Sequence, residues 1–507
     1  MESDRARRIR LRAAAGLCAL ALALTPALLF ASSEAGRGTP KRRVIQHSPP
    51  TLQETLAAAA RRAPAPSSGV SISIAELETG APVFEKNAAT PETIASVTKM
   101  FSTAAALHFL GPDYKFKTTL WRRGDVQDGL LVGSLLVVGG GDPNISGRFY
   151  DDNYNAIFDK WAEGLAKQGI QRVSGDLILN ASFFDAQGRN PEWRGGQEAR
   201  WYQAPSSALS YNDNVIVVSV RPGLKPGGPA AVTIEPECDV LRTVGGVRTV
   251  RRGRPRLGAA RSFGSGDVSV WGTMPAARGA WWSAPIAIDD PPAFFGSALR
   301  YRLQNAGITM LGQTLRQDVQ PDNAWTLVAE TESGLMPSIT VTNKRSQGFY
   351  AEQIFKTLGA VKGGVGSWTT ALAAEKEFFG AIGLDPAKYE LHDGSGLSPQ
   401  NRVAAGDIVK FLLAMNAQPY GPAWKSSLAV SGEPEGTLRH RMTDAMMEGK
   451  VQAKTGSIAG VSTLSGYVTA SSGKTYVFSI LLNGGRVYDT NGHAYQDRIL
   501  RALVKAG

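Results

Sequence analysis

The stretch VQAKTGSIAGVSTLSGYVTASSGKTYVFSILLNG, residues 451–484, decides the fold class. It contains three runs rich in β-branched and aromatic residues, separated by Gly- and Ser-containing turns, which is typical of consecutive β-strands. A second strand-like segment, GVSISIAELETGAPVFEKN at residues 69–87, turns near Glu78–Gly80. The runs match in length, so we expect the last three strands to form a meander that pairs with this N-terminal hairpin.

Helical patterns surround these strands. The segments at 51–62 and 491–504 would form terminal helices, and apolar spacing predicts a buried helix from Ile94 to Leu110. Further helical patterns dominate from Pro292 to Asn416, whereas residues 114–290 carry mostly short alternating runs typical of strands. We therefore predict an α+β domain, with an antiparallel sheet flanked by helices, built from both chain ends and interrupted by a large β-rich insertion.

The first 50 residues have the pattern of an export signal followed by a linker. Five arginines precede an apolar run from Ala13 to Ala31, and small residues follow. The run is long for a signal, so an uncleaved membrane anchor is the alternative. Either way we expect an exported protein of the periplasm or cell envelope. The predicted division is 1–32 signal peptide or anchor, 33–50 linker, 51–112 first part of the α+β domain, 113–290 β-rich inserted part, and 291–507 second part of the α+β domain.

Composition and charge exclude several classes of protein. Apolar residues make up 43% and charged residues 20% of the chain, which is ordinary for a globular protein and rules out wholesale disorder. The formal charge is +11, but much of it lies in the N-terminal segment and at residues 242–261, a stretch with seven arginines and no acidic residue. A nucleic-acid-binding domain usually spreads its basic residues over a face. We interpret the 242–261 stretch as a solvated loop or as a weak contact for anionic polymers of the envelope.

Cysteine and histidine usage points away from disulfide and metal chemistry. Apart from Cys18 in the signal segment, Cys238 is the one cysteine, and its neighbours Glu237 and Asp239 would raise the pKa of its thiol. The five histidines show no metal-ligand spacing. We expect neither a metal nor a cofactor.

The candidate chemistry begins with Ser96-Val97-Thr98-Lys99. Residues three apart on a helix share a face, so the Lys99 amine can reach the Ser96 hydroxyl. A lysine acts as a base when burial or a neighbouring cation lowers its pKa. The spacing alone is weak, since Ser471–Lys474 also matches it within a turn.

Two further segments carry candidate side chains. Lys454-Thr455-Gly456-Ser457 lies on a predicted strand edge, where a cation and hydroxyls can bind a carboxylate and a glycine admits a close backbone. Ser346-Gln347-Gly348 lies in a loop before a helix, where a hydroxyl can relay a proton. The simpler alternatives are a charged edge-strand residue for the first and a helix N-cap for the second.

In this order the segments resemble the S-x-x-K, S-x-N and K-T-G motifs of the penicillin-recognising enzymes. The gap of roughly 250 residues between the first two is similar to that of D-alanyl-D-alanine carboxypeptidases/endopeptidases of the low-molecular-mass class C penicillin-binding proteins. Wider segments agree with this resemblance: GGGDPNIS from Gly139, GDLILNASFFD from Gly175, APSSALSYNDN from Ala204, NKRSQGFYAEQIFKTLG from Asn343, HDGSGLSPQNRV from His392, GTLRHRM from Gly436 and AKTGSIAGVSTLSGYV from Ala453.

The resemblance implies a serine β-lactamase/transpeptidase-like fold and an acyl-enzyme mechanism. Ser96 would attack the penultimate D-Ala carbonyl of a peptidoglycan peptide ending in D-Ala-D-Ala, and Lys99 would take its proton. Ser346 would pass a proton to the leaving amine. Lys454 would help to lower the pKa of Lys99. The implied substrate-binding residues are Lys454, Thr455, Gly456, Ser457, Gln347 and Gly348, and β-lactams would acylate the same serine.

One departure from the family pattern concerns Gly348, which occupies the place of the usual Asn. A lost buried hydrogen bond costs about 1–3 kcal/mol, so we expect acylation to be retained and turnover to be affected. Gln347 is a hypothetical source of a substitute amide. The alternatives are a catalytically weakened peptidoglycan-binding protein and a β-lactamase-like hydrolase. A His triad around His392 is disfavoured, since DGSG lacks the G-x-S-x-G elbow.

Overall fold

The structure is a computed structural model that describes residues 50–66 and 68–507. The predicted signal or anchor, and the predicted linker up to residue 49, lie outside the described residues. Among the helices that are described, none is long and apolar enough to cross a membrane.

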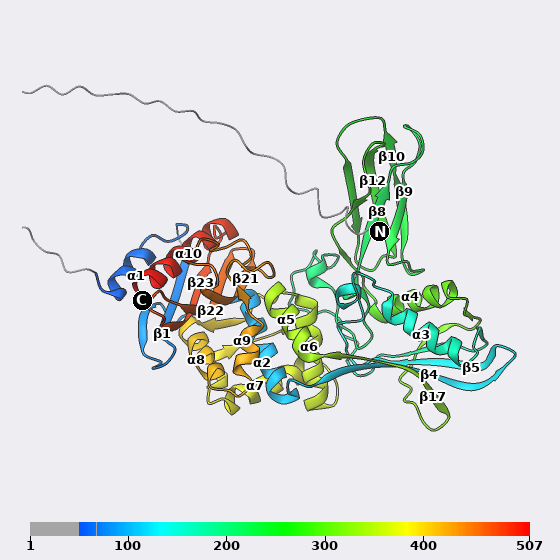
Figure 1. The fold of residues 1–507 in the computed structure, drawn as a ribbon, viewed down its shortest axis with the longest axis horizontal. Coiled ribbons are helices and arrows are strands. Elements are labelled where there is room, and N and C mark those ends of the chain that lie inside the picture. Colours follow the sequence, from blue (N-terminus) through cyan, green and yellow to red (C-terminus); the bar gives the residue numbers. More distant parts are fainter. Residues whose placement is uncertain (1–49, 67) are drawn as a thin grey trace, which may run out of the picture. The chain divides into compact units, whose positions relative to one another are not determined.

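The central sheet of the α+β domain is formed by both ends of the chain, as predicted (Figure 1). Its strand order is β2-β1-β23-β22-β21-β20 and every pairing is antiparallel. The strands are β1 (Gly69–Glu76), β2 (Pro82–Lys86), β20 (Ala429–Val430), β21 (Val451–Ile458), β22 (Val461–Thr469) and β23 (Thr475–Asn483). The N-terminal hairpin joins the C-terminal meander along β1 and β23, where Val70 pairs with Leu482.

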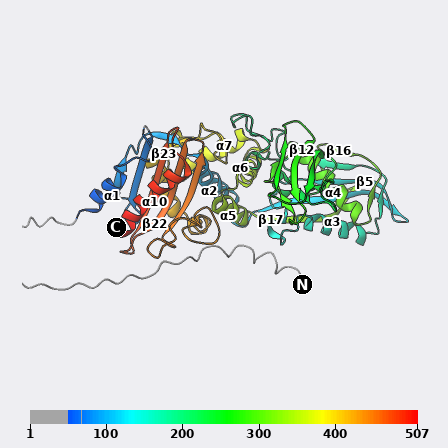
Figure 2. The same cartoon turned by 90° about the horizontal axis from the view of Figure 1, so that it is seen from above.

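Helices cover both faces of this sheet (Figure 2). One face carries α1 (Leu52–Ala60) and α10 (Asp489–Ala506), whose apolar residues share a core with alternate residues of β1 and β23. The other face carries the middle helices around α2 (Lys99–Leu110), with a second core. These helices are α5 (Leu335–Arg345), α6 (Gly348–Gly363), α7 (Trp368–Ala381), α8 (Ala405–Asn416) and α9 (Gly421–Ser426). The three-layer α+β arrangement follows from the two apolar faces of the strands.

A short sheet holds the chain just before the start of α2. Its order is β18-β19-β3, from β18 (Tyr389–Glu390), β19 (Arg402–Ala404) and β3 (Pro91–Thr93). The 3-10 helix η1 (Ala95–Thr98) follows β3 directly and leads into α2. The Ile94 N–H donates to the Asn401 carbonyl at 3.2 Å, so the entry into η1 is fixed by a segment 307 positions further along the chain.

The inserted part is rich in strands but also holds helices. Its strands before residue 290 are β4 (Lys115–Gln127), β5 (Leu130–Val138), β6 (Arg172–Val173), β7 (Leu177–Asn180), β8 (Val215–Arg221), β9 (Ala231–Glu235), β10 (Arg242–Val250), β11 (Arg256–Arg261), β12 (Asp267–Pro275), β13 (Trp281–Trp282) and β14 (Ile286–Ala287). Helix α3 (Ala156–Lys167) lies among them, in a region that the sequence analysis treated as mostly β. Its buried residues Ile157, Phe158, Trp161 and Leu165 follow a helical spacing.

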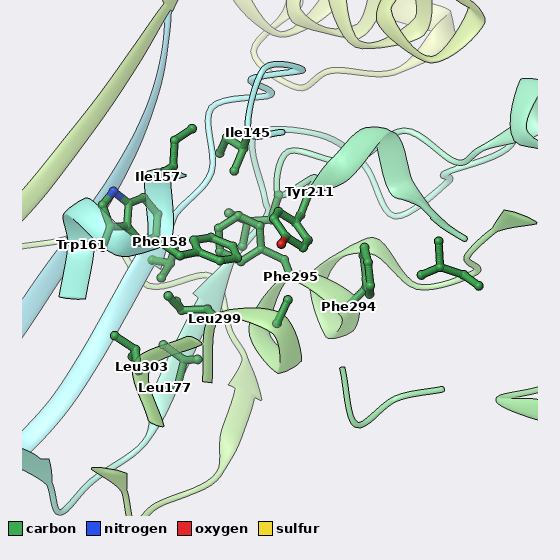
Figure 3. Packing of buried hydrophobic residues seen from close by; sticks show 14 of the residues in the cluster. Ile145, Ile157, Phe158, Trp161, Leu177, Tyr211, Phe294, Phe295, Leu299 and Leu303 are labelled. Carbon is green, nitrogen blue, oxygen red and sulfur yellow. The ribbon is translucent and has the colours of Figure 1, made fainter. Parts of the chain in front are cut away.

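Residues 291–334 pack with the inserted part, although the sequence analysis assigned them to the α+β domain. Helix α4 (Pro291–Asn305) places Phe294, Phe295 and Leu299 in the same apolar core as Phe158 of α3 (Figure 3). The strands β15 (Thr309–Met310), β16 (Thr314–Arg316) and β17 (Trp325–Gly334) pair with β6, β7 and β4 respectively. We therefore propose that the inserted part spans about residues 115–334 and that the α+β domain resumes at Leu335.

Candidate active site

Ser96 and Lys99 lie where η1 passes into α2. The Lys99 Nζ donates a hydrogen bond to the Ser96 Oγ at 2.9 Å. Lys99 is 2% exposed, and its Nζ also donates to the main-chain carbonyl of Ser395. Ala95, directly before Ser96, has φ of 48°, in the left-handed region that residues with a side chain rarely adopt. Such backbone strain is common at active sites.

Ser346 and Lys454 form a second serine–lysine pair. Ser346 has φ of 56° and separates α5 from α6, in the loop before a helix that the sequence predicts. Lys454 lies fully buried on β21, and its Nζ donates to the Ser346 Oγ at 2.8 Å and to the Thr455 carbonyl at 2.8 Å. Residues 108 positions apart in the chain are thus in direct contact.

β21 runs directly beside Ser96. A Cβ added to Gly456 would lie 2.7 Å from the Ile94 carbonyl oxygen and 3.0 Å from the Ser96 nitrogen, so only a glycine fits between the strand and η1. The Thr455 Oγ1 donates to the Thr437 Oγ1 at 2.9 Å, and the Ser457 Oγ donates to the Asp489 carboxylate at 2.6 Å. The three segments singled out in the sequence therefore meet at one place.

A cleft of about 1210 Å³ opens in front of these groups. Of the predicted site residues, Ser96, Lys99, Ser346, Gly348 and Ser457 line it. The inserted part also contributes to the lining, with Arg194, Gln197, Trp201, Tyr202 and Gln203. Tyr488 and Asp489, at the start of α10, line the cleft as well. Sites for small drug-like ligands have volumes of roughly 300–1,000 Å³, so this cleft has room for a peptide.

Known proteins resemble this chain over nearly its whole length. Residues 52–505 match the family described as the D-Ala-D-Ala carboxypeptidase 3 (S13) family. The chain belongs to the S13 family. It is 32% identical over 441 residues to a D-alanyl-D-alanine carboxypeptidase of an Actinomadura species, covering 81% of this chain and 77% of that protein. S13 proteins are serine hydrolases, and the paired Ser96 and Lys99 fit that class.

Solved structures show the same fold. The structure is similar to the crystal structure of penicillin binding protein 4 (dacB) from Haemophilus influenzae, with a TM-score of 0.74 and 22% identity, over 88% of this chain and 97% of that one. The same Haemophilus protein complexed with a β-lactam gives a TM-score of 0.70 at 22% identity, over 88% and 98% of the two chains. The predicted transpeptidase-like α+β fold is confirmed.

This S13 chain departs from the S-x-N motif at the third position, where it has Gly348 in place of Asn. Gly348 lines the cleft, but the Gln347 side chain is not part of the lining formed by the described residues. The Gln347 amide instead donates to the Asp213 carboxylate of the inserted part at 3.1 Å. The Gln347 amide is thus held by a carboxylate that does not line the cleft, and its role as a substitute for the missing Asn amide stays a prediction.

Two buried carboxylates that were not predicted from the sequence lie behind Lys99. Glu352 of α6 accepts hydrogen bonds from the Ser395 N–H at 2.8 Å and the Gly394 N–H at 3.3 Å. Asp393 accepts from the N–H groups of Gly396, Leu397 and Ser398 at 2.7, 3.0 and 2.8 Å. Together they hold the loop whose Ser395 carbonyl binds the Lys99 amine.

The surroundings of these two carboxylates explain their burial. Glu352 occurs in α6, which is buried almost throughout, and Asp393 precedes a Gly-rich run whose N–H groups it can cap. A Trp also donates to each: Trp368 to Glu352 and Trp193 to Asp393, both at 2.8 Å. The DGSG segment, Asp393 to Gly396, thus holds the Lys99 amine through the Ser395 carbonyl. It does not act as a nucleophile elbow.

Burial lowers the pKa of both site lysines, Lys99 and Lys454. It lowers the pKa of Lys99 to about 8, against the opposing effect of the Asp393 and Glu352 carboxylates. Burial also lowers the pKa of Lys454 well below its usual value, and the positive charge of Lys99 lowers it further. The pKa of Glu352 is raised to about 7, first by burial and then by the Asp393 charge. A buried amine with a pKa near 8 suits a general base at neutral pH.

This pKa predicts the pH dependence of acylation. Only the unprotonated Lys99 can accept the Ser96 proton, so the rate of acylation by penicillin should rise about tenfold per pH unit below pH 8. Above pH 8 the rate should level off. Stopped-flow measurement from pH 6 to 9.5, corrected for free penicillin hydrolysis, checks this. A rate that does not vary over that range would contradict the assignment of Lys99.

Among the described residues, no group of three or more His, Cys, Asp or Glu side chains is arranged to hold a metal ion. The Cys238 thiol is partly buried in the inserted part, and burial raises its pKa to about 11.

Proposed function

We propose that this S13 enzyme removes the terminal D-Ala from peptidoglycan stem peptides through an acyl-enzyme on Ser96. The observation that carries the proposal is the 2.9 Å contact between the Lys99 Nζ and the Ser96 Oγ, at the edge of a peptide-sized cleft. The named S13 relative is itself a D-alanyl-D-alanine carboxypeptidase.

In the first step the Ser96 Oγ attacks the carbonyl carbon of the penultimate D-Ala. Its proton passes to the Lys99 Nζ, and the carbonyl oxygen becomes an oxyanion. The backbone N–H groups of Ser96 and Ser457 would donate to this oxyanion. One such donor is worth roughly 3–4 kcal/mol in comparable acyl transfers.

In the second step the C–N bond breaks and the terminal D-Ala leaves as an amine. The proton that Lys99 took from Ser96 would pass to this amine through the Ser346 hydroxyl, which is bound to Lys454 at 2.8 Å, and Lys99 would again be unprotonated. A water molecule then attacks the Ser96 ester, with Lys99 again taking the proton. This step returns the free Ser96 hydroxyl and releases the shortened peptide.

Lys454, Thr455 and Ser457 would bind the terminal carboxylate of the substrate. An incoming carboxylate favours the protonated form of Lys454, whose pKa is low in the free enzyme. The Ser457 hydroxyl must then turn away from Asp489, to which it donates at 2.6 Å. A penicillin presents a strained amide beside a carboxylate and would acylate Ser96 in the same way, and the Haemophilus protein has been solved with a β-lactam.

The proposed substrate lies outside the cytoplasm, which fits the predicted export segment at residues 1–32. We propose an exported enzyme of the periplasm or cell envelope, free or tethered by that segment. The same acyl transfer would cut a D-Ala–diaminoacyl crosslink if the cleft accepts the second peptide.

The function is tested by incubating the enzyme with a soluble pentapeptide ending in D-Ala-D-Ala and with purified peptidoglycan. Mass spectrometry of the products distinguishes loss of one D-Ala from cleavage of crosslinks. We expect D-Ala release that the Ser96→Ala variant does not catalyse. Failure of the wild type to release D-Ala from either substrate would refute the proposal.

Restoring the missing amide should raise turnover. A Cβ at Gly348 would lie 3.3 Å from the Tyr202 carbonyl oxygen and 3.9 Å from the Ser395 Cβ, so the Cβ of an Asn is accommodated if the Tyr202 carbonyl moves by a few tenths of an ångström. We expect Gly348→Asn to raise the kcat for D-Ala release by about tenfold or more, the value of one recovered hydrogen bond.

The control for this change is Gly380→Asn in α7, where an added Cβ meets no heavy atom of the described residues within 4 Å. Its kcat should equal that of the wild type. A kcat for Gly348→Asn at or below the wild-type value, with an unchanged Tm, would show that the glycine does not limit turnover. Gly348 is also the feature that favours a second candidate, a weakened peptidase that mainly binds peptidoglycan.

A further inference from the structure

The inserted part carries a sheet of order β10-β12-β11 with one buried and one exposed face (β10 and β12 are labelled in Figure 1). The residues of its inner face belong to the core of the inserted part: Val247, Val268, Val270 and Met274 are each at most 3% exposed. Alternation along the strands then places the intervening residues on the outer face. The arginine-rich 242–261 stretch forms β10, β11 and the turn between them.

The register aligns the outer-face residues into rows across the three strands. Gly246, Trp271 and Gly258 form one row, and Arg248, Thr273 and Arg256 form the next. We call these six residues the Trp271 face. An aromatic ring with a glycine on each side therefore lies next to a pair of arginines.

Trp271 is 52% exposed although it lies in the middle strand of the sheet. Its ring lies over Gly258, because a Cβ there would come within 2.3 Å of the Trp271 Cε2. On the other side, a Cβ at Gly246 would meet no heavy atom of the described residues within 4 Å. The ring thus borders open space on the side of β10.

The arginines beside the ring are uncompensated. The exposed side chains of Arg248 and Arg256 make no ion pair or hydrogen bond with any residue that the structure describes. Asp267 lies at the opposite end of β10 and β12 and is paired with Arg242 at 2.6 Å. The turn adds further exposed arginines: Arg251, Arg252 and Arg254.

We propose that the Trp271 face binds a peptidoglycan strand, with a sugar ring stacked on Trp271 and carboxylates held by Arg248 and Arg256. The proposal rests on the proposed function and names a second contact with the same polymer. The apolar face of a pyranose ring matches a flat exposed indole. Stem peptides and muramic acid residues carry carboxylates, which guanidinium groups bind in a bidentate manner. Because a glycan strand repeats, one contact would keep the cleft near further stem peptides.

The test is co-sedimentation of penicillin-acylated protein with insoluble peptidoglycan at physiological salt. Acylation blocks the cleft, so pelleting reports other contacts. We expect Trp271→Ala, and separately the Arg248→Ser/Arg256→Ser double variant, to raise the apparent Kd by about tenfold or more. Trp271→Tyr should retain most of the binding, since it keeps an exposed aromatic ring.

Matched controls are available on other elements. Trp282 of β13 is also 52% exposed, and Arg123 and Arg172 are exposed residues of β4 and β6. Trp282→Ala and Arg123→Ser/Arg172→Ser should pellet as the wild type does. Pelleting of Trp271→Ala equal to the wild type would overturn the proposal. Displacement by single-stranded DNA at lower concentration than by soluble glycan fragments would also overturn it, and would assign the face to nucleic acid.

Activity on a soluble pentapeptide separates this proposal from the proposed function. Trp271→Ala should release D-Ala from the soluble peptide at the wild-type rate and act more slowly on insoluble peptidoglycan. If the wild type releases no D-Ala from the soluble peptide, the proposed function fails, and the pelleting result still decides whether the Trp271 face binds the polymer.

Discussion

Lys99→Met is expected to slow acylation of Ser96 by about a hundredfold to ten-thousandfold, the range for loss of a general base. Met keeps the unbranched, apolar part of the side chain, so the buried position stays filled. It removes the amine that donates to the Ser96 Oγ at 2.9 Å and to the Ser395 carbonyl. The measurement is the second-order rate constant for labelling by a fluorescent penicillin.

The control for this variant is Lys410→Met, which removes an exposed amine of α8 that pairs with Asp407 at the surface. Its labelling rate should equal that of the wild type. The Tm of Lys99→Met is measured in parallel, because the change leaves the Ser395 carbonyl without its donor. A labelling rate within threefold of the wild type would eliminate Lys99 as the base.

Gly456→Ala is expected to lower both acylation and D-Ala release by at least about a hundredfold. The added Cβ would lie 2.2 Å from the Thr463 Oγ1, 2.7 Å from the Ile94 carbonyl oxygen and 3.0 Å from the Ser96 nitrogen. Two of these contacts are backbone atoms, so β21 or η1 must move. A displacement of about 1 Å at the reacting groups is enough for a loss of this size.

Gly279→Ala provides the matched control, since its added Cβ meets no heavy atom of the described residues within 4 Å. It should leave acylation unchanged. The effect of Gly456→Ala should appear in the acylation rate of protein that remains folded by circular dichroism. Wild-type acylation in that variant would show that the close approach of β21 to Ser96 is not needed.

The sheet and its helices could be predicted because their signals are local. Alternating apolar residues in 451–484 and 69–87 require strands with buried faces, and Ser96 and Lys99 meet through helical spacing alone. The contact between Ser346 and Lys454 has no local cause. That the two segments belong to one site was expected from the resemblance alone, and the 2.8 Å contact between their side chains is seen only in the structure.

Other features were out of reach for physical reasons. The pattern of residues 291–305 predicts a helix but does not say which core it joins, and α4 packs in the inserted part. Glu352 and Asp393 are charged residues, which sequence patterns place at the surface. Both are nevertheless buried, because the hydrogen bonds that they accept replace those lost to water. Gln347 lies next to Gly348 in the sequence, but adjacency does not fix the direction of a side chain, and in the structure Asp213 holds the Gln347 amide.

The central claim is that Ser96, activated by Lys99, forms the covalent intermediate. Its most direct test is mass spectrometry of the penicillin-treated protein after proteolytic digestion. We expect a single penicilloyl adduct on the peptide that contains Ser96, and no adduct in Ser96→Ala. An adduct on another serine, or undiminished labelling of Ser96→Ala, would contradict it.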